Sequence, residues 1–189
     1  MSEIERRDVL RGGALGALVG AVGTAGIGEA ATPGYRMAAT RSPEQQFFLA
    51  VSGIDGPSTA KGFEKQIPVL AFSWGVTDTT PPFGTGSGKA VEGPFAFSAA
   101  TSKATPPLVK LSCTGGHIAT VVLTGLRRNS AGVLTKYLKL TLTDAIVSAV
   151  RIGESGQGAA TDQVSLGYKT VTLVIDGMSM TFDFAANAA

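Results

Sequence analysis

The chain has 189 residues, 44% of them hydrophobic, and a formal net charge of only +2. This length is enough for one domain with a sizeable core. The charges are dispersed and no basic run is interleaved with aromatic residues, which excludes a dedicated nucleic-acid binder, and the single cysteine, Cys113, excludes an internal disulfide.

The first thirty residues have the order of an export signal. Arg6 and Arg7 begin a stretch that resembles a twin-arginine motif, Gly12–Ile27 follows without a charge, and small residues offer a cleavage point near Ala30. The apolar stretch is short for a membrane span and rich in glycine. We expect residues 1–30 to be a cleaved signal, so the protein is secreted or in the cell envelope, without stable membrane insertion. The alternatives are an apolar tail or a retained anchor helix, and a cytoplasmic protein if the leader does not function.

Residues 31–44 have little periodicity and are predicted to be a flexible lead-in to one β domain over residues 45–189. In that domain, Phe47–Val51 is predicted to be a short strand, and Gly53–Gly62 a loop dense in Gly, Pro, Asp and Ser.

The next segment, Ile67–Gly75, alternates strictly between large and small residues and therefore predicts a strand. The bulky face, expected to enter the core, holds Leu70, Phe72 and Trp74. The small, half-polar face holds Val69, Ala71, Ser73 and Gly75. Such a face suits a packed surface or the wall of a water-filled cavity.

The middle of the chain is predicted to be a long loop, a short strand and a helix. Asp78–Gly93 has no core-forming periodicity, and a loop of this length is usually functional. Pro94–Ser98 is predicted to be a strand with both of its phenylalanines on one side. Thr105 is the expected cap of a short helix, which has proline in its first turn and ends near Gly115.

Four further strands are predicted by alternation: His117–Arg127, Leu134–Ile152, Asp162–Ile175 and Met178–Phe184. We expect a bulge near Asp144, a change of face within the third of these strands, and a two-residue hairpin turn at Asp176-Gly177. About seven strands and one short helix, connected sequentially, predict an all-β antiparallel sandwich or barrel.

Residues that carry catalytic chemistry are sparse. Cys113 and His117 lie four apart at the end of the predicted helix without an evident third partner, so a buried structural cysteine and a partly exposed histidine are favoured over a nucleophile pair. One Cys and one His are too few for a zinc site. The dispersed carboxylates at strand ends and turns are best explained as turn caps; they are Asp144, Glu154, Asp162, Asp176 and Asp183. We expect no enzyme activity, metal or cofactor; a hydrolase is a minor alternative that requires Cys113 or His117.

Six blocks, in order, are similar to the Hcp (haemolysin-coregulated protein) family, the tube subunits of type VI secretion systems. They are Phe47–Gly56, Leu70–Gly75, Lys103–His117, Leu140–Gly156, Asp162–Tyr168 and Phe182–Asn187. The segment Leu70–Gly75 departs from the family's Leu-Ala-Trp-Ser-Trp-Gly only at Phe72.

The resemblance implies a β-barrel with one flanking helix, six-membered rings that stack into a tube, and effector cargo in the lumen. It implies self-association and effector or spike proteins as partners. Ser73 takes the position that faces the lumen in the family, and Ala71 shares its face. Phe83 and Lys89, in the long loop, are candidates for contact with the next ring.

An export leader conflicts with assembly in the cytoplasm, where the tube proteins of the family form. The alternative function is an exported, monomeric or small-oligomer barrel that uses the same fold to bind a ligand or a protein. Its binding loops would be 78–93 or 153–161.

Overall fold

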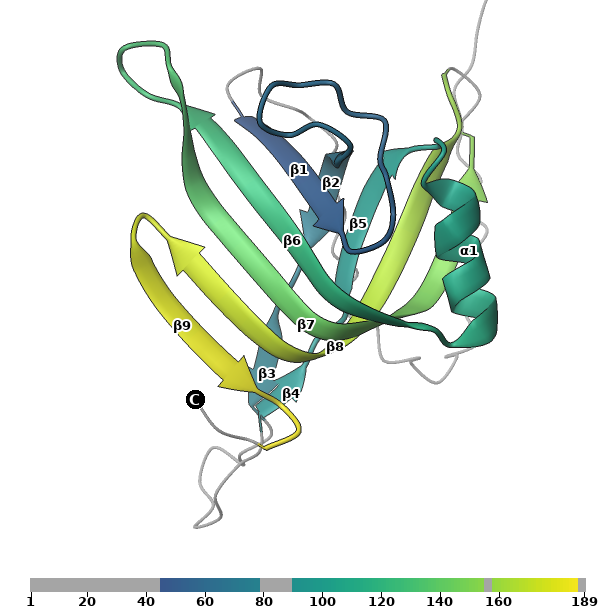
Figure 1. Cartoon of the computed structure of the whole chain (residues 1–189). Helices are drawn as coiled ribbons and strands as arrows, with labels where there is room; N and C mark the ends of the chain where they lie inside the picture. Colours follow the sequence, from purple (N-terminus) through teal and green to yellow (C-terminus); the bar gives the residue numbers. More distant parts are fainter. Residues whose placement is uncertain (1–44, 79–89, 155–157, 187–189) are drawn as a thin grey trace, which may run out of the picture. The chain divides into compact units, whose positions relative to one another are not determined.

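A computed structural model describes residues 45–78, 90–154 and 158–186. Within these ranges the chain forms nine strands and one helix (Figure 1). They are β1 Gln45–Val51, β2 Ile67–Ser73, β3 Val76–Asp78, β4 Ala90–Glu92, β5 Phe95–Ala100, α1 Thr105–Thr114, β6 His117–Arg128, β7 Leu134–Gly153, β8 Thr161–Ile175 and β9 Met178–Asp183.

Seven strands make one antiparallel sheet in the order β5-β2-β1-β6-β7-β8-β9, and β5 also pairs with β8. This second pairing closes six of the strands into a barrel, and β9 extends the sheet from the other half of β8. The predicted all-β class with one short helix is therefore confirmed. Closure leaves fewer edges than an open sheet of the same strands would have.

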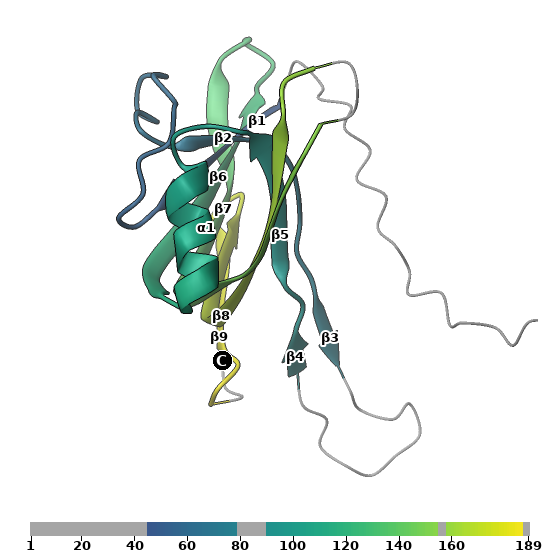
Figure 2. The ribbon, with the colours of Figure 1, turned by 90° about the vertical axis from the view of Figure 1, so that its right-hand side faces the viewer.

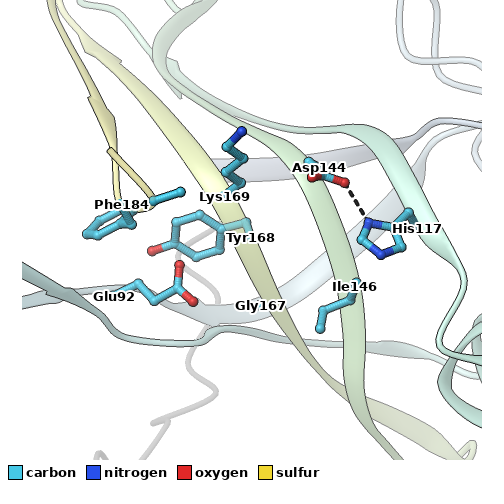
Figure 3. Close-up of a pocket in the computed structure, with 9 residues that line it drawn as sticks. Glu92, His117, Asp144, Ile146, Gly167, Tyr168, Lys169 and Phe184 are labelled. Atoms are coloured by element: carbon cyan, nitrogen blue, oxygen red, sulfur yellow. Dashed lines mark hydrogen bonds and ion pairs between the residues drawn. The ribbon is translucent and has the colours of Figure 1, made fainter. Parts of the chain in front are cut away.

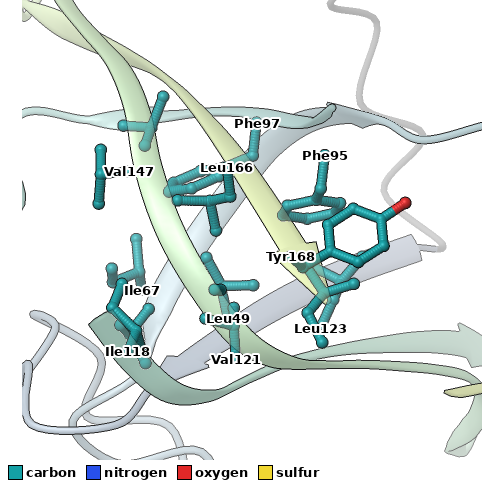
Figure 4. Packing of buried hydrophobic residues seen from close by; sticks show 14 of the residues in the cluster. Leu49, Ile67, Phe95, Phe97, Ile118, Val121, Leu123, Val147, Leu166 and Tyr168 are labelled. Carbon is teal, nitrogen blue, oxygen red and sulfur yellow. The ribbon is translucent and has the colours of Figure 1, made fainter. Parts of the chain in front are cut away.

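The core lies inside the barrel, where the inward faces of its strands meet (Figure 4). Its largest fully buried side chains are Phe95, Phe97, Leu49, Leu123, Leu140, Leu142, Leu166, Val69, Val121, Val164 and Val171. The two phenylalanines of β5 share the inward face, as the alternation of that strand predicts. Each fully buried side chain of this size contributes about 1.5–3 kcal/mol through the hydrophobic effect.

β7 and β8 are the longest strands, with 20 and 15 residues. β8 changes its inward parity as predicted, because Leu166 and Tyr168 are buried in its first half and Val171 in its second. In β7 the register shifts between Val147 and Ala149, a few residues beyond the bulge predicted at Asp144. Asp144 itself has a positive φ of 53°, an unusual backbone conformation for a residue other than glycine.

The turn between β8 and β9 is the predicted two-residue hairpin. Ile175 pairs with Met178, and both turn residues, Asp176 and Gly177, have positive φ angles of 49° and 86°. These angles match a type I′ turn, whose twist suits the strands on either side. Arg127 donates a hydrogen bond of 2.7 Å to the Asp176 carboxylate, which ties the turn to β6.

Thr105 was predicted to be the cap of the helix, but it is the first residue of α1. Ala104 occupies the cap position and makes no side-chain cap bond. The Thr105 hydroxyl instead accepts from the Ser102 N–H at 3.0 Å and donates to the carboxylate of Asp162 in β8. Thr101 also donates to Asp162, at 2.7 Å. Asp162 is therefore a buried anchor between helix and barrel, not the turn cap predicted. The predicted end of the helix is confirmed by Gly115 in a left-handed C-cap.

The segment predicted as one long loop begins and ends as strand. β3 and β4 pair with each other, with Val76 opposite Glu92 and Asp78 opposite Ala90, and they run beyond the barrel from β2 and β5 (Figure 2). We call this two-stranded sheet the arm. In the described part of the chain, no helix has both the length and the apolar character needed to cross a membrane.

Candidate functional site

The strand singled out by the sequence, β2, has a β-bulge in its middle. Before it, Ile67 and Val69 are buried; the register shifts between Val69 and Ala71, and after it Phe72 and Trp74 pack against the core. The prediction that Val69 shares the small outer face was wrong, since it is 0% exposed. A bulge of one residue moves every following side chain to the other face of the sheet. The prediction assumed alternation without a bulge, and it therefore placed the first half of β2 on the wrong face. Leu70 is half-buried and lies outside the core cluster.

The two residues predicted to face a lumen lie after this bulge. Ala71 is opposite Ser98 and Ser73 opposite Ala96 on β5, and both are half-buried in the single chain. Their orientation toward a lumen stays a prediction. Phe83 and Lys89 lie outside the described residues, as do Arg6 and Arg7.

The base of the arm is held to the barrel by hydrogen bonds. The Trp74 indole N–H donates to the Tyr168 hydroxyl at 2.5 Å, and that hydroxyl donates to the carbonyl oxygen of Gly93 at 3.1 Å. The Gly93 N–H in turn donates to the Gly75 carbonyl at 2.9 Å. A Cβ at Gly93 would lie 2.7 Å from that carbonyl oxygen, so this crossing requires glycine. No local pattern predicts the contact between Trp74 and Tyr168, because these residues are far apart in the chain.

A cavity of about 410 Å³ opens beside this contact (Figure 3). It is lined by Glu92, His117, Asp144, Ile146, Gly167, Tyr168, Lys169, Phe184 and Ala185. Its place follows from the topology, because β8 pairs with β5 as far as Leu166 and with β9 only from Thr170. We call the three residues between these pairings, Gly167–Lys169, the notch of β8.

Burial shifts the pKa values of two acidic groups at the cavity, the Tyr168 hydroxyl and the Glu92 carboxyl. It raises the pKa of Tyr168, an effect that the hydrogen bond from Trp74 opposes and the Glu92 charge reinforces. Burial also raises the pKa of Glu92. The Oε2 atom of Glu92 is buried and has no hydrogen-bond partner among the described residues.

On the opposite side of the cavity, His117 Nδ1 lies 2.6 Å from Asp144 Oδ1. No partner for His117 was evident in the sequence, and Asp144 was predicted to cap a turn. The pair was missed because Asp144 lies on a different strand, β7. Cys113 is exposed, which corrects its predicted burial. Among the described residues, no thiol or hydroxyl is hydrogen-bonded to His117.

Metal binding has no candidate site in the described ranges, because they contain no group of three or more His, Cys, Asp or Glu residues placed to hold an ion. The cavity lining presents hydrogen-bonding groups, charged side chains and aromatic rings. The closed barrel, the flanking helix and the arm define a β-barrel protein with one short helix.

Comparison with known proteins places this barrel in a family. The model of the family described as "Type VI secretion system effector, Hcp" matches residues 48–174. The chain is 32% identical to Hcp1 from Salmonella typhimurium, covers 98% of it with 77% of its own length, and superposes with a TM-score of 0.66.

Two further solved structures support the same placement. Hcp2 from Salmonella typhimurium is 27% identical, with 76% of this chain and 99% of that one covered and a TM-score of 0.60. A type VI secretion system effector from Yersinia pestis is 25% identical, with 72% and 98% covered and a TM-score of 0.60. None of the curated proteins matches the chain. The chain belongs to the Hcp family of type VI secretion proteins.

Proposed function

We propose that the protein is a tube subunit that assembles into six-membered rings, stacks them, and carries effectors in the lumen. The observation that carries this proposal is that its barrel matches Hcp structures over 98% of their length. The match thus includes the whole of those subunits, not one isolated motif. In the ring, Ala71 and Ser73 would face the lumen, and Phe83 and Lys89 would reach the neighbouring ring.

An apolar edge is available for contact between subunits. β9 is the last strand of the sheet, and its first half carries Met178 and Met180, which are 80% and 43% exposed. Exposed apolar side chains on an edge strand favour association with another chain. A head-to-tail contact that closes at six would cover this edge in every copy.

The solution mass of the full chain, measured together with negative-stain images, tests the proposal. Six-subunit rings support it. A monomer over a wide concentration range contradicts it and favours the alternative function. Met178→Asp is expected to weaken the rings, whereas Val133→Asp, at another exposed apolar residue in the turn between β6 and β7, should leave them intact.

Cargo binding needs a separate test. Ser73→Gln should leave the rings intact and change the retention of effector if Ser73 lines the lumen. Rings that form normally and retain effector as before would contradict that position.

The leader supports a second candidate, an exported barrel that binds a ligand or a protein outside the cytoplasm. Arg6 and Arg7 followed by an uncharged stretch favour it. Changing both to lysine should keep the protein in the cytoplasm, and mass spectrometry of the exported protein should find the new N-terminus near Ala30. Export that is unchanged in this variant would exclude the twin-arginine route.

A further inference from the structure

The notch of β8 creates a cavity whose floor has no side chain. Gly167 faces Ile146 across the β7–β8 pairing, and an added Cβ would meet only the Ile146 side chain, at 3.5 Å. The backbone around Gly167 would therefore allow a larger residue, and the space above it is open because this position is glycine. Its volume of about 410 Å³ is within the range of small-ligand sites.

Glu92 lines this cavity with a carboxylate that no described residue fully satisfies. Its Oε2 atom is buried without a hydrogen-bond partner among the described residues, although buried polar groups nearly always have one. The Tyr168 hydroxyl, which lines the same cavity, already donates to the Gly93 carbonyl and accepts from Trp74. The missing donor therefore has to come from outside this set of hydrogen bonds.

The charges around the cavity favour a cation on the Glu92 side. Asp144, the second carboxylate, is held by His117 at 2.6 Å. Lys169 extends away from Glu92 (Figure 3), and its charge lowers the pKa of Asp183. The rings of Tyr168 and Phe184, which are 4% and 7% exposed, lie beside Glu92 (Figure 3), and aromatic rings attract a nearby cation.

We propose that this cavity binds a guanidinium or alkylammonium group, with Glu92 as its hydrogen-bonded counter-ion and the two aromatic rings beside it. The group is either an arginine or lysine side chain of a protein partner or a free small amine. A charged donor suits Glu92 better than a neutral one, because hydrogen bonds between ionised groups are shorter and stronger. This site is separate from the proposed lumen residues and does not depend on ring formation.

The test uses the full chain and three probes: acetyl-Gly-Arg-Gly-amide, n-butylammonium and, as the charge-reversed control, acetyl-Gly-Glu-Gly-amide. Backbone amide NMR signals of Gly167 and Tyr168 report binding. The emission of Trp74, the only tryptophan of the chain, gives a second readout, because its indole is bonded to Tyr168. We expect saturable shifts with the two cations, and none with the acidic peptide. Tighter binding of the arginine peptide assigns the site to a protein partner, and tighter binding of butylammonium assigns it to a free amine.

Two variants locate the site. Glu92→Gln should weaken cation binding at least tenfold, and Gly167→Val should abolish it by filling the floor. Glu64→Gln, which changes an exposed carboxylate outside the cavity lining, should bind like the wild type. The proposal is overturned if neither cation shifts Gly167, if the acidic peptide binds equally well, or if Glu92→Gln binds unchanged. Glu92→Gln nearly keeps the size of the side chain while it removes the charge and replaces one acceptor oxygen with an NH2 group, so it tests the proposal even if Gly167→Val does not fold.

Discussion

Asp162→Ala is expected to destabilise the fold although it removes only a small polar side chain. Asp162 is 4% exposed and accepts hydrogen bonds from Thr101 and Thr105, which connect the start of α1 to β8. Thr105 is also 4% exposed, so its hydroxyl would lose a charged acceptor without gaining water. Thr101 is exposed and recovers water. A buried group left unsatisfied costs about 1–3 kcal/mol and a hydrogen bond to a charged group contributes about 1.5–3, so we expect a loss of about 2–3 kcal/mol.

Urea unfolding of the full chain, followed by Trp74 emission, measures this loss. For a domain of this size the corresponding drop in Tm is about 5–10 °C. The matched control is Asp55→Asn, which changes a carboxylate whose side chain is 59% exposed and should alter stability by less than about 0.5 kcal/mol.

A double-mutant cycle isolates the bond between helix and barrel. Thr105→Val has a cost of its own, because the hydroxyl also accepts from the Ser102 N–H. The double variant with Asp162→Ala has no buried hydroxyl at position 105 that lacks an acceptor. The stability losses of the two single variants should therefore sum to more than the loss measured for the double variant. Strict additivity, or an Asp162→Ala variant as stable as the wild type, would refute the role of Asp162 as an anchor.

Three further outcomes follow from burial and from the pKa shifts. Phe97→Ala should cost about 3–5 kcal/mol in urea unfolding, whereas Met178→Ala, at a side chain that is 80% exposed, should cost less than about 0.5; equal losses would contradict the assigned core. Because burial raises the pKa of Tyr168, the folded protein holds the phenolic proton more tightly, and stability should fall as pH rises past 10.0; Tyr168→Phe should flatten this fall and shift the emission of Trp74. The raised pKa of Glu92 means that its contribution is present below about pH 4.5 and is lost as pH rises, so Glu92→Gln should have a higher Tm than the wild type at pH 7, with a gap that closes in acid. A difference in Tm between the two proteins that stays constant with pH would show that burial does not raise the pKa of the Glu92 carboxyl.

Much of the barrel was predictable because its signals are local. Alternation in β5 placed Phe95 and Phe97 together in the core, and Asp176-Gly177 marked the hairpin through its preference for positive φ. The change of face in β8 was also visible as a shift of parity. Alternation failed where the backbone changes register, as in β2, where Val69 proved to be buried. It also did not predict the pairing of β3 with β4, whose three-residue strands are too short for a pattern.

The sequence by itself therefore determined the fold class, most strands, the helix and the family blocks, because side-chain period and turn preference act between neighbouring residues. Only the tertiary structure decided which distant groups meet. Closure of the barrel brings Trp74 to Tyr168 and Asp162 to the helix start, and the register of β6 with β7 brings His117 to Asp144. It also makes the notch, because β5 and β9 share the edge of β8 without meeting. These contacts depend on strand register and on how burial is distributed, and neither can be read from residues so far apart in the chain.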